Sequence, residues 1–80
     1  MSAQRRKLQT NIGKLLADRR RRQGFSSSRA LAETFPDELD WNTIAQIEAG
    51  SDFRMSSFLR LCRMLKIKPE SILKHLKENI

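Results

Sequence analysis

Two amide side chains, Asn42 and Gln46, stand four positions apart in the segment LDWNTIAQIEAG, residues 39–50. On a helix this spacing places both side chains on one face, while Ile44 and Ile47 point to the opposite side. Asn and Gln can pair bidentately with N6 and N7 of adenine in the major groove of DNA. The segment therefore predicts a helix that can recognise base edges. The alternative is an ordinary amphipathic helix with a polar outer face.

Trp41, directly before this pair, has two interpretations that do not exclude each other. An exposed tryptophan could contact a thymine methyl group or lie against the DNA backbone. Alternatively its ring could pack onto Leu39 or Phe35 and fix the preceding turn. The sequence leaves both open.

Two helices are predicted before this segment. The first is followed by Gly24, which suits a helix end, and its apolar stripe consists of Leu8, Ile12, Leu15 and Leu16. Ser27 is the best N-cap of a short second helix, because its side-chain oxygen can accept a hydrogen bond from the first turn. Pro36 ends this helix, since the residue before a proline disfavours helical conformation.

Three more helices are predicted from Asp40 onward. Asp40 is expected to cap the third helix and Gly50 to close it. A fourth amphipathic stretch follows over residues 55–65, and Pro69 falls in the first turn of a fifth, where proline is tolerated. No alternating strand pattern is found, so the chain is expected to be all-α, a compact bundle of about five helices.

Length, charge and cysteine content limit the classes of function. The chain has 80 residues, 39% hydrophobic residues and a formal net charge of +7, which predicts one small domain with a polyanionic partner. Residues 1–22 and 53–80 are basic, whereas residues 23–52 carry only Arg29 against six carboxylates. A single cysteine excludes an internal disulfide, and no apolar run approaches about 18 residues. The basic N-terminus lacks the apolar stretch of a secretory signal. We expect a cytoplasmic protein without a membrane-spanning segment.

Four features occur in order along residues 12–73. They are the Ile-Gly pair at 12–13, the Leu-Ala pair at 31–32, the TIxxIExG pattern at 43–50 and the Leu-x-x-x-Leu-x-Ile-x-Pro passage at 61–69. Together they resemble the Cro/lambda-repressor-like (xenobiotic-response-element type) helix-turn-helix family. The chain resembles the short stand-alone members of this family, such as restriction–modification controller proteins and repressors of phages and mobile elements. The resemblance implies a helix-turn-helix formed by the second and third helices.

The resemblance also implies roles for individual residues. Base recognition by the helix at 41–49 falls on Trp41, Asn42, Thr43 and Gln46. Ser28, at the start of the second helix, matches a family position that contacts phosphate. Further candidates for phosphate contacts, from their charge or position near the motif, are Ser27, Arg29, Arg54 and Arg60. In the family an arginine of the first helix reaches a glutamate after the recognition helix, which implies a structural ion pair between Arg20 and Glu48.

The chain departs from the family pattern between the second and third helices. Here FPDELD, residues 35–40, replaces a short glycine turn and is about two residues longer. The turn could contain a helical turn of its own, which would change the angle of the recognition helix. Because carboxylates repel phosphate, we expect Asp37, Glu38 and Asp52 to lie on the outer side of the turn, away from the DNA backbone.

An enzyme is not expected. His75 has no catalytic partner in the sequence, and Cys62 falls on an apolar stripe that is typical of a small core residue. No metal-ligand cluster and no glycine-rich phosphate loop is found, so neither a metal nor a cofactor is predicted.

These features predict a single domain, residues 1–80, that binds a palindromic DNA operator as a homodimer and regulates transcription. A basic extension covers residues 1–10, and the C-terminal helix, residues 69–80, is expected to form the dimer interface through Ile72, Leu76 and Ile80. In the alternative, Ile72 and Leu76 cover the core of the monomer. RNA polymerase is a further candidate partner. A second hypothesis uses the same scaffold as a protein-interaction module, an anti-activator or antitoxin, whose acidic turn binds a basic partner.

Overall fold

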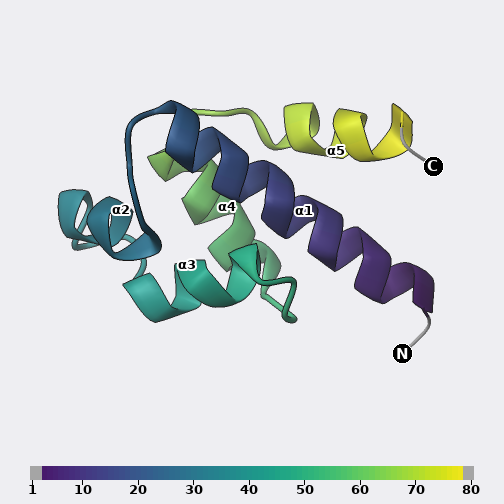
Figure 1. Cartoon of the computed structure of the whole chain (residues 1–80), viewed down its shortest axis with the longest axis horizontal. Helices are drawn as coiled ribbons and strands as arrows, with labels where there is room; N and C mark the ends of the chain where they lie inside the picture. The colour runs from purple at the N-terminus through teal and green to yellow at the C-terminus, as the bar shows by residue number, and fades with distance from the viewer. Residues whose placement is uncertain (1–2, 79–80) are drawn as a thin grey trace.

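Helices form the whole regular structure of the described part of the chain (Figure 1). The computed structural model describes the backbone of residues 3–78 and the side chains of residues 7–75. In chain order the helices are α1 (Ala3–Arg22), α2 (Ser28–Thr34), α3 (Trp41–Glu48), α4 (Met55–Met64) and α5 (Pro69–Glu78). The predicted all-α bundle of five helices, with a helix-turn-helix at α2 and α3, is confirmed.

Helices α2 and α3 begin after the N-cap residues that the sequence predicted, Ser27 and Asp40. The Ser27 side-chain oxygen accepts a hydrogen bond of 3.0 Å from the Ala30 N–H, as expected of an N-cap. Asp40 is the N-cap of α3, but its carboxylate accepts a hydrogen bond from the Thr43 hydroxyl rather than from a backbone N–H. The start of each helix of the pair is therefore set by a local polar contact.

Three helices end with the same backbone hydrogen bond. The N–H groups of Phe25, Ser51 and Ile67 reach back to the carbonyls of Arg20, Gln46 and Cys62, over 3.1, 3.0 and 3.0 Å. This pattern requires a left-handed residue just before each donor, and the φ angles of Gly24, Gly50 and Lys66 are 91°, 88° and 56°. Helices α1, α3 and α4 thus stop abruptly, which fixes the direction of the next segment.

The lengthened connection between α2 and α3 is a β-turn rather than a further helical turn. Phe35 ends α2 with a φ of −127°, and the Glu38 N–H donates to the Phe35 carbonyl over 3.1 Å, with Pro36 at the corner. Arg60 of α4 donates to the Glu38 carbonyl over 3.2 Å. The turn is therefore held against α4.

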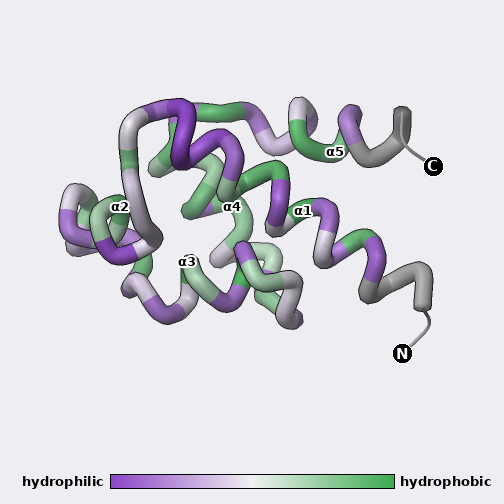
Figure 2. The backbone as a smooth tube through the Cα atoms, in the orientation of Figure 1, coloured by the Kyte–Doolittle hydropathy of each residue, from purple (hydrophilic) through white to green (hydrophobic). Residues whose placement is uncertain are grey.

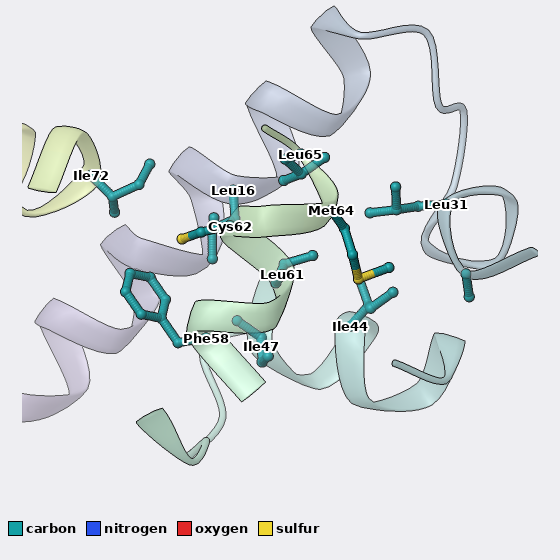
Figure 3. Packing of buried hydrophobic residues seen from close by; sticks show 11 residues of the cluster. Leu16, Leu31, Ile44, Ile47, Phe58, Leu61, Cys62, Met64, Leu65 and Ile72 are labelled. Atoms are coloured by element: carbon teal, nitrogen blue, oxygen red, sulfur yellow. The ribbon is translucent and has the colours of Figure 1, made fainter. Parts of the chain in front are cut away.

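All five helices contribute to one hydrophobic core, with α4 at its centre (Figure 3). Helix α4 supplies Phe58, Leu61, Cys62 and Met64, while the other helices supply, among others, Leu16, Leu31, Ile44, Ile47 and Ile72. Figure 2 shows that the C-terminal end of α1 is hydrophilic. The apolar stripes predicted from the sequence are largely satisfied within one chain.

The expected position of Ile72 at the dimer interface is wrong. Its side chain is 0% exposed because it packs into the core, so it cannot be an exposed interface residue in this fold. The alternative interpretation, that Ile72 covers the core of the monomer, is confirmed. The side chain of Leu76 and the whole of Ile80 lie outside the described residues.

Gly13 allows α1 and α3 to lie in direct backbone contact. A Cβ atom at this position would lie 2.5 Å from the carbonyl oxygens of both Ile47 and Glu48. Any larger residue would therefore push the C-terminal end of α3 away from α1. The orientation of α3 depends on this close approach.

Candidate nucleic-acid interface

Helix α3 presents a polar face to solvent. Trp41, Asn42 and Gln46 are exposed, Trp41 to 45%, whereas Ile44 and Ile47 on the opposite side are buried in the core. Because Asn42 and Gln46 are four residues apart, their side chains follow one another along the exposed side. The predicted division of α3 into an amide face and a buried face is confirmed.

A hollow of about 490 Å³ lies between α3 and the start of α4. Its lining residues from both helices and the loop between them are Thr43, Gln46, Ile47, Asp52, Phe53, Arg54 and Ser57. The predicted phosphate residue Arg54 and the predicted base-recognition residue Gln46 therefore border the same hollow. Ser57 was not identified from the sequence, because only the packing of α4 against α3 brings it there.

Asp52, which the sequence predicts to lie away from the DNA backbone, borders the same hollow as the predicted DNA-contacting residues Gln46 and Arg54. The Gln9 side-chain amide donates a hydrogen bond to this carboxylate. Asp52 is in this place because the α3–α4 loop runs beside the first helix, which the local sequence does not specify.

Thr43, in the first turn of α3, both borders the hollow and forms a hydrogen bond within the chain. Its side chain lines the hollow, and its hydroxyl donates a hydrogen bond to the Asp40 carboxylate. This hydrogen bond lowers the pKa of Asp40 below its usual 3.8. The Thr43 hydroxyl already has an acceptor within the chain.

The Trp41 ring stacks against an arginine. The guanidinium carbon of Arg29, from α2, lies 4.8 Å from the centroid of the ring, within the range of a cation–π contact. The ring contact of Phe35 is with Phe25 instead, at a centroid distance of 6.5 Å. Two residues predicted to contact different parts of DNA are thus joined to each other.

The predicted ion pair between Arg20 and Glu48 is present and largely buried. The Arg20 Nε and Nη2 atoms donate to the two Glu48 carboxylate oxygens over 2.8 and 3.1 Å, and the side chains are 7% and 11% exposed. Ser28 adds a hydroxyl hydrogen bond of 3.3 Å to the same carboxylate. The Ser27 and Ser28 side chains therefore both have partners within the chain.

The remaining candidate groups lie outside this face. Cys62 is buried in the core, as predicted, and burial raises the pKa of its thiol to about 11. His75 borders a separate hollow of about 220 Å³ between α1 and α5, with Arg19, Ser71 and Lys74. Among the described residues, no group of three or more His, Cys, Asp or Glu side chains could hold a metal ion.

Comparison of the chain with protein-family models, with curated proteins and with solved structures found no match. Within residues 3–78, no helix has both the length and the apolar character needed to cross a membrane. The candidate interface consists of the exposed amide face on α3, bordered by Arg29 at one end and by Arg54 across the hollow.

Proposed function

We propose that this protein is a sequence-specific double-stranded DNA-binding transcriptional regulator that places α3 in the major groove. The observation that supports this function best is the exposed pair Asn42 and Gln46 on a helix whose other side is buried. Amide side chains can each make a bidentate contact with adenine, worth about 1–3 kcal/mol of discrimination. The major groove is wide enough to admit an α-helix.

The surroundings of α3 are suited to a role in recognition. Its C-terminal end is held by the Arg20–Glu48 ion pair and by the close approach at Gly13, so its side chains are presented in a fixed orientation. Arg54 and Arg29 are exposed on either side and provide cations for phosphate or base. The acidic groups nearest to this face, Asp40 and Asp52, are engaged with Thr43 and Gln9.

The regulator acts as a homodimer on a palindromic operator, whose half-sites lie about one helical turn apart. With Ile72 buried, Leu73 is the exposed apolar residue of α5 within the described side chains, at 51% exposure, and we assign it to this interface. We place the protein in the cytoplasm, because its single unpaired cysteine suits a reducing compartment and its proposed ligand is DNA. It performs no catalysis in this proposal.

The test is selection of binding sites from a random duplex library at near-physiological salt. The wild type should enrich an inverted repeat with half-site centres about ten base pairs apart. Asn42→Ala/Gln46→Ala should lose or relax this motif. A matched control, Lys14→Ala/Arg63→Ala, removes two exposed side chains from α1 and α4, away from α3 and from the proposed dimer interface, and should leave the motif unchanged.

Salt and size measurements complete the test. If six to ten phosphates are contacted, affinity should fall by about 10³–10⁵ between 50 and 200 mM salt while the site preference is kept. Leu73→Glu should shift the protein towards monomer in light scattering and weaken binding to the full palindrome more than to a half-site. Failure to enrich any motif would contradict the proposal.

The alternative function is a protein-interaction module, and one observation favours it. The β-turn at residues 35–38 is fixed by Arg60 and exposes Asp37, so a rigid acidic feature is available to a basic partner. This alternative predicts weak DNA binding that does not respond to Gln46→Ala. Asp37→Asn would then abolish binding of the protein partner.

A further inference from the structure

Arg29 and Trp41 form a defined unit at the N-terminal ends of two helices. Arg29 is the second residue of α2 and Trp41 is the first residue of α3, and the guanidinium carbon lies 4.8 Å from the ring centroid. Both residues are exposed. Among the described residues the guanidinium has no carboxylate partner, so its contact with the ring is what holds it.

This contact leaves the hydrogen-bonding edge of the guanidinium available. A cation–π contact uses the planar face of the group, whereas its N–H donors point outward in the plane. A flexible arginine becomes a fork of fixed orientation, able to stack and to donate two parallel hydrogen bonds at the same time. Such a fork suits either a phosphate or the O6 and N7 pair of a guanine, so the position of the group decides between them.

The unit also extends the row of base-contacting groups on α3. Gln46 lies one turn beyond Asn42, and Trp41 immediately precedes Asn42 at the start of the helix. The Arg29 guanidinium on the Trp41 ring therefore lies at the N-terminal end of the row, and Gln46 at the other. Side chains near the N-terminal end of a recognition helix are those that usually reach base edges.

We propose that Arg29, held by the Trp41 ring, recognises a guanine through O6 and N7 in each half-site. This inference rests on the proposed function, and it assigns Arg29 to base recognition rather than to the phosphate contact predicted from the sequence. Arginine bidentate to guanine is the commonest specific contact in the major groove. The position of the group predicts an order along the half-site: guanine, then the base pair contacted by Asn42, then that contacted by Gln46.

The experiment measures competition binding with the operator that the wild type selects. Each guanine of a half-site is replaced by adenine in turn, in both half-sites together, and the loss of affinity is compared between variants. In the wild type, replacement of the guanine next to the Asn42-dependent position should weaken binding by about tenfold or more. Circular dichroism verifies that each variant is folded, which is expected because both side chains are exposed.

Three variants separate base recognition from charge. Arg29→Lys keeps the positive charge but lacks the planar fork, so discrimination at this guanine should fall to about threefold or less while other positions are unaffected. Trp41→Leu leaves every charge in place and should reduce the discrimination at the same guanine. Trp41→Phe keeps an aromatic face and should retain the preference for guanine.

The outcomes separate this inference from the proposed function. If a motif is selected but Arg29→Lys keeps every base preference, or loses affinity equally for all duplexes, Arg29 contacts phosphate and the inference is overturned. The function then stands. If the wild type selects no motif at all, the proposed function fails and the inference fails with it.

Discussion

The Arg20 guanidinium donates two hydrogen bonds, of 2.8 and 3.1 Å, to the Glu48 carboxylate, which lies 28 positions further along the chain. The Nη1 atom of the same guanidinium donates to the Phe25 carbonyl over 2.8 Å. The Ser28 hydroxyl donates to Glu48 from the start of α2. The Glu48 carboxylate, paired with the buried Arg20, therefore connects the ends of α1 and α3 with the beginning of α2.

Glu48→Ala should destabilise the fold by about 3 kcal/mol, because it leaves the buried Arg20 charge without its carboxylate. Urea unfolding measured by circular dichroism gives this free energy. The matched control is Asp18→Ala, which breaks the ion pair of Asp18 with Arg22, whose side chains are 46% and 72% exposed. That control should cost less than about 1 kcal/mol. Equal effects of the two substitutions would show that burial of the Arg20–Glu48 pair has no consequence.

Gly13→Ala should lower stability by about 1–3 kcal/mol, although alanine favours helices more than glycine does. The added Cβ would lie 2.5 Å from two backbone carbonyl oxygens of α3, so the helices must separate. Thermal unfolding tests this. Lys14→Ala, at the next and exposed position of the same helix, should change stability by no more than about 0.5 kcal/mol. A stabilising effect of Gly13→Ala would mean that α1 and α3 are not in close contact.

Lys66→Gly should stabilise the protein by about 1 kcal/mol. Lys66 has a φ of 56° at the end of α4, a left-handed conformation that glycine adopts without the steric cost borne by other residues. Lys68→Gly removes the same charge at a residue without positive φ, and should be neutral or destabilising. The midpoints of urea unfolding of the two variants should therefore move apart. A shared shift would indicate an effect of charge alone.

The buried thiol of Cys62 should lower the free energy of unfolding at alkaline pH. Burial raises the pKa of the thiol from its usual 9.0 to about 11, so between these values the unfolded chain loses a proton that the folded chain keeps. The contribution of Cys62 is complete below pH 9 and is lost as pH rises towards 11, at up to about 1.4 kcal/mol per pH unit. The difference in unfolding free energy between wild type and Cys62→Ala isolates this contribution from lysine titration. A difference that does not vary between pH 9 and 11 would contradict the burial of the thiol.

The sequence by itself determined the features that depend on neighbouring residues. Ser27 and Pro36 delimit α2, and Gly50 closes α3, because caps, glycine and proline act within one helical turn. The spacing of Ile44 and Ile47 against Asn42 and Gln46 separated the buried face of α3 from its exposed face. The Arg20–Glu48 pair was predicted through the family resemblance, since neither residue specifies its partner locally.

The tertiary structure alone decided which side chains from different helices meet. Ile72 was expected at an interface and is buried, because α5 packs along α1 (Figure 1). Asp52 lines the hollow beside Gln46, and Arg29 lies on the Trp41 ring, because the angles between helices bring them there. Periodicity gives the face of a helix on which a residue lies. The partner across that face depends on interhelical packing, which the close approach at Gly13 and the end of each helix together determine.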